Sequence, residues 1–511
     1  NFLSLFRLGI VDKDVHGHVT VNGSEVAEDD TIRFNIQQTS TEEAKDGKVA
    51  EGIYGVVIKK TSGDGDAENL VVEYTLKGVD IDDGRTLEMR GTSSDQNDDA
   101  NTFGAYLTGA GNLEIAAESV RLTATNSYTG TTTVASGATL YVDENSLGTD
   151  AASTASLNIA ESGAVHVNGN NVVRGIQNNG GLYLGSQYPT GDAGEADAPT
   201  LTLQSDVSAG SRIDGTLYGV GTLKVVGSGD VDNENPSADL TIVGSQGDFL
   251  GDLVLDSGAW VHLDATSSNL FGSSSSEASN EIQVSEDSLL TIASDVNRDS
   301  AFSGVLKDGS DGRGGLKGGR VVMTLASTDN EFAFSSKQSE DDFTGTFALE
   351  RGTINLGNLT DGGELGNRVL AKATLELGAE SVAELERSTA FSAVDSFLGG
   401  LTMNGGTIAF GSINYDGGDD PNVAGAHASH INLGGDGVLT LVEQGEGQKQ
   451  STITISQDET NRISDAGDEL LAADDGTSIV LIHNIGSLHY IDAEGNDFGD
   501  VTDKALSGGY I

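Results

Sequence analysis

The sequence predicts an all-β chain, folded as a right-handed parallel β-helix (β-solenoid) with loop insertions and a C-terminal cap. Three observations favour this fold. The 511 residues include 70 glycines but only 4 prolines, and 5% are aromatic, which suits short strands joined by turns. Apolar and polar residues alternate over short segments, so one face of each strand is buried and the other is solvated. One segment of the chain also recurs.

The recurring segment is "NSYTGTTTVASGATLYV", residues 126–142. Each of three copies has an aromatic residue, a glycine two positions later, an apolar residue six positions later and a turn glycine nine positions later. We expect each aromatic residue to lie beside a turn and each apolar residue to face the core. The aromatic residues are Tyr128, Phe249 and Phe343, and the apolar residues are Val134, Leu255 and Leu349.

Small and polar residues for the corners, with a core of Val, Leu and Ile, favour a β-helix over an array of β-sandwiches. No linker or break in composition recurs at the interval of an immunoglobulin-sized domain. We expect a coil of roughly 20–30 residues and a spacing of about 4.8 Å between coils. The expected regions are N-terminal β-rich coils with loops (1–105), the repeat-bearing β-helix (106–400), and the end of the β-helix with its cap (401–511).

Charge and composition exclude several classes of function. The formal net charge is −52, from 79 acidic and 27 basic residues, so nucleic acid is not an expected partner. Cysteine is absent, which excludes disulfides, a thiolate nucleophile and cysteine-ligated metals. No apolar run approaches the ~20 residues that span a bilayer.

Particular residues carry a resemblance to a known family. The segments "GAGNLEI", "VRLTATNSYTGTTTVASGATLYV" and "NSLG" are similar to the passenger-associated strand repeat of Gram-negative autotransporters. The tail, "LTMNGGTIAFGS" and then "DELLAADDGTSIVLIHNIGSLHYIDAEGND", resembles the end of the β-helix in AIDA-like adhesin passengers, where a cap of autochaperone type assists folding. The resemblance covers roughly residues 110–511, and the first hundred residues match nothing we can name.

The resemblance implies a passenger domain of type V secretion. Such a domain is displayed on the bacterial outer membrane or secreted, and we expect the signal peptide and the translocator barrel to lie outside this chain. The family's passengers include enzymes, chiefly serine proteases and esterases, and non-enzymatic adhesins. The absence of cysteine suits export of an unfolded chain through a narrow pore.

The sequence offers little for catalysis or for metal binding. The nearest match to a protease signature, "LDSGAW" at 255–260, lacks its first glycine and places Ser257 within the repeat, and no G-x-S-x-G motif occurs. The pairs His16 with His18 and His427 with His430 are expected to be solvated, although the first pair with Asp12 or Asp14 has ligand types suited to zinc. Acidic clusters such as "SGDGDAEN" and "YDGGDDPN" lack the EF-hand pattern, so we expect solvated loops, with weak calcium binding as the alternative that the sequence leaves open. We therefore expect no enzyme, no cofactor and no metal.

One stretch of the chain is rich in basic residues although the chain as a whole is acidic. The segment "VLKDGSDGRGGLKGGR" contains four bases separated by glycines, which we name the basic cluster: Lys307, Arg313, Lys317 and Arg320. It is the candidate ligand site for an anionic sugar or an acidic protein. The alternative interpretation is a flexible insertion whose bases offset nearby acids.

These observations predict a surface-exposed adhesin involved in virulence. We expect cell aggregation and biofilm formation through another copy of the chain, or attachment to a host-matrix protein or glycosaminoglycan. The alternative is an enzyme that acts on polysaccharide, or another hydrolase, because β-helices also carry paired acids in a groove. The sequence does not choose between self-association and a host ligand.

Overall fold

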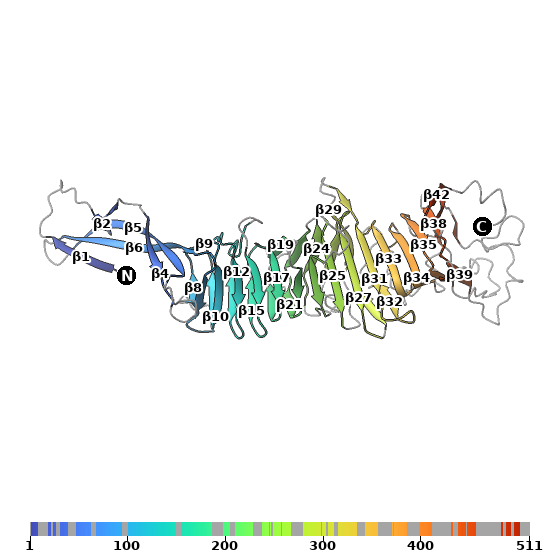
Figure 1. Ribbon diagram of the computed structural model, residues 1–511, viewed down its shortest axis with the longest axis horizontal. Helices are drawn as coiled ribbons and strands as arrows, with labels where there is room; N and C mark the ends of the chain where they lie inside the picture. Colours follow the sequence, from blue (N-terminus) through green and yellow to red (C-terminus); the bar gives the residue numbers. More distant parts are fainter. Residues whose placement is uncertain are drawn as a thin grey trace, which may run out of the picture. The chain divides into compact units, whose positions relative to one another are not determined.

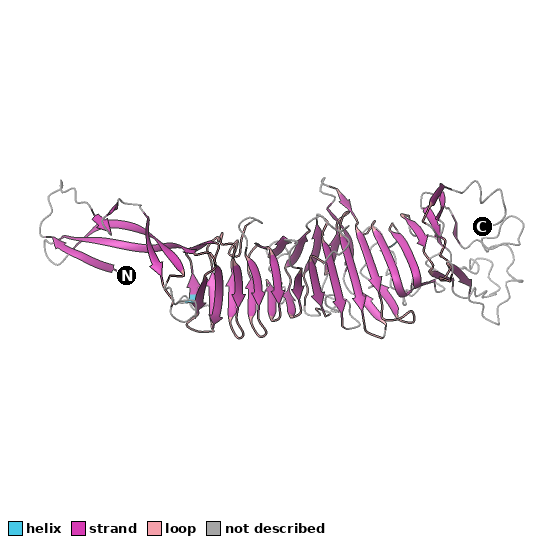
Figure 2. Cartoon of the chain, viewed as in Figure 1, coloured by secondary structure: helices cyan, strands magenta, loops and turns pink. Residues whose placement is uncertain are grey.

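A computed structural model describes the fold of this chain, and the described residues form strands joined by turns and loops with no α-helix among them (Figure 2). The described residues are 2–8, 19–21, 24–26, 31–38, 48–62, 68–94, 101–149, 155–185, 198–204, 210–227, 238–244, 246, 249–256, 258–266, 280–297, 299–302, 305–310, 315–334, 343–355, 370, 372–385, 398–410, 431–432, 438–445, 447–455, 482–483, 487–491 and 495–500. The expected all-β class is confirmed.

The chain divides into two compact units. Unit 1 comprises Asn1–Gly185 and Pro199–Thr202, and unit 2 comprises Ser186–Ala198 and Leu203–Ile511. Each unit contains sheets whose strands are mostly parallel. The expected region boundaries near residues 105 and 400 stay a prediction.

Unit 1 begins with an antiparallel sheet that leads into parallel sheets. Its strands are, in sheet order, β1 (Phe2–Leu8), β6 (Glu68–Ile81), β5 (Ala50–Ser62) and β4 (Thr31–Ile36), with a separate pair of β2 (Val19–Val21) and β3 (Ser24–Val26). The last residues of β6 pair antiparallel with β5 and also in parallel with β9 (Tyr106–Gly109). β6 therefore belongs to both arrangements.

Two parallel sheets make up the rest of unit 1. The first contains β7 (Thr86–Arg90), β10 (Asn112–Ala117), β12 (Thr131–Val134), β14 (Ser156–Ile159) and β17 (Gly175–Asn178). The second contains β8 (Thr102–Phe103), β11 (Ser119–Leu122), β13 (Thr139–Val142), β15 (Ala164–Val167) and β18 (Gly181–Leu184), and β16 (Asn171–Val173) lies between β15 and β17 in the chain. Residues in register in the first sheet are 19 to 27 apart in the chain, close to the length expected for one coil.

The side chain of Gln38 covers the backbone of the edge strand β7 at Glu88. Its side-chain amide donates to the carbonyl oxygen of Glu88 at 2.6 Å and accepts from the Glu88 amide at 2.8 Å. The side chain thus makes the two bonds that a further strand would make with β7. Such protection matters because an unpaired strand edge can pair with other chains.

Unit 2 contains one long and one shorter run of parallel strands. The long run includes β20 (Ser211–Ile213), β23 (Leu240–Val243), β25 (Trp260–Ala265), β27 (Leu289–Ser294), β28 (Ser300–Phe302), β31 (Arg320–Thr324), β32 (Glu331–Phe334), β33 (Thr346–Asn355), β34 (Thr374–Leu385), β35 (Gly400–Met403), β36 (Thr407–Phe410), β38 (Val438–Val442), β39 (Thr452–Ile455) and β41 (Ser487–Ile491), followed by the antiparallel β42 (Asp497–Asp500). The shorter run is β22 (Thr222–Val226), β24 (Asp252–Asp256), β26 (Glu281–Val284) and β29 (Val305–Ser310), which ends in a hairpin with β30 (Leu316–Lys317). Further strands are β19 (Thr200–Gln204), β21 (Thr216–Gly219), and the pair β37 (Ile431–Asn432) and β40 (Ile482–His483).

The core of unit 2 contains a column of apolar side chains along the long run of strands. The residues in this column pair in register from strand to strand, and all are at most 8% exposed. They are Leu240, Val261, Leu290, Val321, Phe347, Leu375, Leu401, Leu439 and Leu488. In Figure 1 the strands β25, β27, β31 and β33 that carry part of this column lie side by side. This arrangement is compatible with a β-helix.

The three repeats are alike in which side chains they bury but not in their turns. Tyr128, Phe249 and Phe343 are 0% exposed, as are the inward residues Val134, Leu255 and Leu349. The turn glycines Gly137, Gly258 and Gly352 have positive φ angles of 77°, 75° and 119°, a conformation that glycine adopts without strain. The expected burial of Val134, Leu255 and Leu349 is confirmed, and backbone turns are present at Gly137 and Gly258. Gly352 instead lies within strand β33, in register with Ser381 and just after a shift in register, so the third expected turn is wrong.

The glycine two positions after each aromatic residue has a different role, which is close approach between coils. A Cβ on Gly130, Gly251 or Gly345 would lie only 2.1, 1.8 and 2.1 Å from the carbonyl oxygen of Gly111, Gly221 and Gly319, respectively. No side chain fits at that distance. Each repeat therefore needs this glycine because the backbone of the preceding coil passes directly beneath it.

Candidate binding surface

The basic cluster lies at and beside a hairpin of unit 2. β29 and β30 pair antiparallel at Gly309 with Lys317 and at Ser310 with Leu316. Asp308 anchors the base of the hairpin, because its nearly buried carboxylate accepts hydrogen bonds from the amide and the hydroxyl of Thr344, both at 2.7 Å. Leu316 is 76% exposed, so an apolar side chain stands in solvent beside the bases.

The described members of the basic cluster are each paired with an acid. Lys307 pairs with Glu281 on β26, Lys317 with Glu286 in the following turn, and Arg320 with Glu376 on β34. Arg313 lies outside the described residues. Because the three bases bind three different carboxylates, an anionic ligand would have to displace those partners. Exposed ion pairs contribute about 0–1 kcal/mol each, so displacement is inexpensive and the site stays a prediction.

A second surface feature lies on the outward face of β23, β25, β27 and β31. Side chains on these strands alternate between buried and solvent-facing positions. Five of the solvent-facing residues are apolar, and we name them the apolar strip: Val243, Trp260, Leu289, Ala293 and Val322. On β12 and β14 of unit 1, by contrast, the corresponding outward positions hold threonine, serine and asparagine. The outward face of these strands thus mixes apolar with polar side chains, with Trp260 and Leu289 side by side.

Trp260 is held in one orientation by its neighbours. Its indole Nε1–H donates to the Thr291 hydroxyl oxygen at 3.0 Å, and His262 Nδ1 lies 2.8 Å from the same oxygen. Its backbone amide donates to the carboxylate of Asp239 at 2.8 Å. The polar edge of the indole is therefore satisfied within the protein.

Charged groups flank the apolar strip on both sides, and they are already paired. Arg212 Nε lies 2.8 Å from both carboxylate oxygens of Asp214, and this bond, followed by the charges of Asp214 and then Asp264, raises the pKa of Arg212. On the other side Arg320 reaches over β33 to Glu376, and Ala348 of β33 is 4% exposed. Neither arginine leaves an excess positive charge beside the strip.

An aromatic stack occupies an outward position of unit 1. Tyr141, His166 and Tyr183 are in register on β13, β15 and β18, and their ring centroids are 4.7 and 4.3 Å apart. Burial between the two rings lowers the pKa of His166 to about 4. The imidazole is therefore neutral at physiological pH and acts as a packing group.

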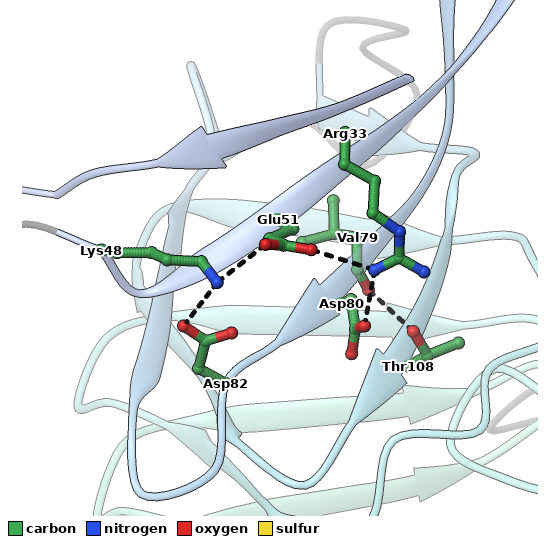
Figure 3. A network of polar contacts seen from close by, with 7 residues as sticks. All are labelled: Arg33, Lys48, Glu51, Val79, Asp80, Asp82 and Thr108. Carbon is green, nitrogen blue, oxygen red and sulfur yellow. Dashed lines mark hydrogen bonds and ion pairs between the residues drawn. The ribbon is translucent and has the colours of Figure 1, made fainter. Parts of the chain in front are cut away.

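A network of ion pairs joins the strands at the start of unit 1 (Figure 3). Lys48 contacts Glu51 at 2.9 Å and Asp82 at 3.2 Å, while Arg33 contacts Glu51 at 3.0 Å and Asp80 at 2.9 Å. The bonds from Lys48 and then Arg33 lower the pKa of Glu51. Since each charge has a partner of opposite sign, the network braces β4, β5 and β6 and offers no free group for a ligand.

The remaining candidates from the sequence lie outside the described residues. These are Ser257 and the histidine pairs at 16 and 18 and at 427 and 430. Within the described part of the chain, no group of three or more His, Cys, Asp or Glu side chains is arranged to hold a metal ion. Sequence reasoning did not single out Trp260 with Thr291, although an apolar residue at an outward position of an alternating strand is a visible signal.

Comparison with known proteins returned no relative. No protein-family model, no curated protein and no solved structure matches the chain. In the part of the chain that the structure describes, no helix has the length and apolar character needed to cross a membrane. A functional proposal must therefore come from the residues and their geometry.

Proposed function

We propose that this chain is a non-catalytic adhesin, folded as a right-handed parallel β-helix with loop insertions and a C-terminal cap. It is a passenger domain of the autotransporter kind, located on the outer-membrane surface of a bacterium or secreted from it. It mediates aggregation and biofilm formation, or attachment to a host-matrix protein or glycosaminoglycan.

The observation that carries the proposal is the register of the parallel strands. Alternation directs the apolar side chains of successive coils into one core column, and it leaves the alternate side chains of the same strands in outward columns. Such columns present many similar groups on a continuous face. Individually weak contacts along a face of this kind act together, so binding strength grows with the length engaged.

The autotransporter assignment rests on the resemblance of the repeats and tail, and the described geometry of the repeats supports it. The aromatic anchor and the close-approach glycine each have a structural role in all three copies. Their recurrence is what a solenoid with spaced repeats requires.

Display of the chain on a non-aggregating bacterium tests the proposal. We expect the displaying cells to settle faster than cells that carry an unrelated protein at equal density, or to attach to immobilised matrix protein or heparin. Cells that neither settle nor attach above that control would contradict an adhesive function. Turnover of casein, short esters or glycosaminoglycans by the purified protein, abolished by one Ser, Asp or Glu substitution, would contradict the absence of catalysis.

A further inference from the structure

The apolar strip on β23, β25, β27 and β31 has the features of a ligand platform. Outward positions elsewhere in these sheets hold mainly polar groups, as on β12 and β14. Here a tryptophan, a leucine and two valines face outward from neighbouring strands. Trp260 and Leu289 are in register on adjacent strands, whereas Val243, Ala293 and Val322 lie among polar side chains such as Asp264 and Thr291. Apolar side chains that lie side by side on a solvated surface can mark binding sites.

The platform is organised before any ligand arrives. The hydrogen bond from the indole of Trp260 to Thr291 joins adjacent strands, β25 and β27, and His262 contacts the same hydroxyl. Folding has therefore already fixed the ring. A ligand that stacks on it does not have to immobilise it, which lowers the entropic cost of binding.

The charges around the strip favour an uncharged ligand. Arg212 is paired with Asp214 and lies near Asp264, and Arg320 is paired with Glu376. A polyanion would have to displace the carboxylate partners of these two described arginines and would meet a chain whose net charge is −52. The same polar groups still offer hydrogen-bond donors and acceptors around an apolar centre.

We propose that the apolar strip binds a neutral glycan, with one pyranose ring stacked on Trp260 and the hydroxyls of that sugar and its neighbours in the chain hydrogen-bonded by His262, Asp264 and Arg212. A pyranose ring has apolar C–H faces and polar hydroxyl edges, which match the apolar centre and polar border of this surface. Neighbouring strands lie about 4.8 Å apart, close to the length of one sugar residue, so a chain of sugars fits across successive strands. This inference rests on the proposed adhesive function and assigns a neutral glycan as the ligand of the apolar strip.

The single tryptophan of the chain makes the site directly observable. Selective excitation of Trp260 in the purified full chain reports only on this surface. We expect a saturable change in emission on titration with cellohexaose or mannohexaose, and none with heparin. Trp260→Ala should weaken binding of the responsive sugar by about tenfold when measured by calorimetry.

Two further variants separate stacking from a folding defect. Trp260→Phe keeps an aromatic ring and should retain binding within about threefold. Thr291→Val keeps the volume but frees the indole, and should weaken binding by a similar factor. The matched control is Leu316→Ser on the hairpin, which should leave the titration unchanged, and circular dichroism verifies the fold of every variant.

Several outcomes would overturn the inference. They are no response to either neutral sugar at millimolar concentration, equal affinity of Trp260→Ala and the unmodified chain, a response to heparin alone, or emission that changes with protein concentration without sugar. The last outcome would assign the strip to contact with a second copy. Settling and attachment of displaying cells are measured in parallel. If adhesion persists although no neutral glycan binds, the inferred ligand is wrong and the proposed adhesive function is unaffected.

Discussion

Replacement of His166 by phenylalanine should change how the stability of unit 1 depends on pH. The imidazole lies between Tyr141 and Tyr183, and burial lowers its pKa to about 4. In the unfolded chain the ring regains a pKa of about 6.5. At pH values between these two pKa values, His166 binds a proton in the unfolded state but not in the folded state. Stability is therefore fully present above pH 6.5 and is lost progressively as the pH falls toward 4.

The size of the effect follows from the shift in pKa. Linkage gives a loss of at most about 2 kcal/mol between pH 8 and pH 5, and the residual exposure of the half-buried ring reduces this to about 1–2 kcal/mol. The variant His166→Phe retains an aromatic ring in the stack but cannot titrate. It should lack this part of the pH dependence.

Urea unfolding followed by circular dichroism, at pH 8 and at pH 5, measures the difference. We expect the unmodified chain to lose about 1–2 kcal/mol more than His166→Phe over this interval. Tyr183→Phe is the matched control, because it alters the same stack without removing the group that titrates. If His166→Phe and the unmodified chain lose equal stability, the imidazole is not held neutral by its neighbours and the reasoning is refuted.

Three other predictions address the repeats and the basic cluster. The Tyr128 and Thr132 hydroxyls bond to each other in the core, so Thr132→Val alone should cost about 1–3 kcal/mol in unfolding free energy, whereas adding Tyr128→Phe should restore much of it. Gly251→Ala would place a Cβ 1.8 Å from a carbonyl oxygen and should prevent normal stacking, whereas Gly137→Ala, with open space but a φ of 77°, should cost only about 1 kcal/mol on thermal unfolding. If heparin is a ligand, changing all four bases of the basic cluster to serine should abolish its binding, and salt should weaken binding to the unmodified chain. Self-association should instead strengthen with moderate salt and survive that change, since two chains of charge −52 repel each other.

The repeats show how much of the fold a sequence can predict. The spacing from Tyr128 to Val134 and Gly137 recurs at Phe249 and Phe343, and alternation alone assigns each side chain to the core or to solvent. Those assignments are confirmed because they depend on neighbours within a few residues. The role of Gly130 was not predictable in this way, since it depends on the backbone of the preceding coil at Gly111.

The candidate sites depended far more on tertiary structure. The basic cluster is continuous in sequence, yet Lys307, Lys317 and Arg320 pair with acids that lie 26, 31 and 56 residues away in the chain. Charge counting predicted a free basic patch or a neutralised loop without choosing between them. The ion pairs favour neutralisation of the three described bases, because folding brings Glu281, Glu286 and Glu376 from other coils beside them.

Local pattern in the sequence determined which residues of the repeats face inward and that the chain is built from strands. Only the tertiary structure decided which outward residues meet, such as Trp260 with Thr291 on the next strand of the sheet. The physical reason is the variable length of the coils. Residues in register along the core column of unit 2 are separated by 21 to 49 positions, so alternation specifies the face of a side chain but not its neighbour on the next strand.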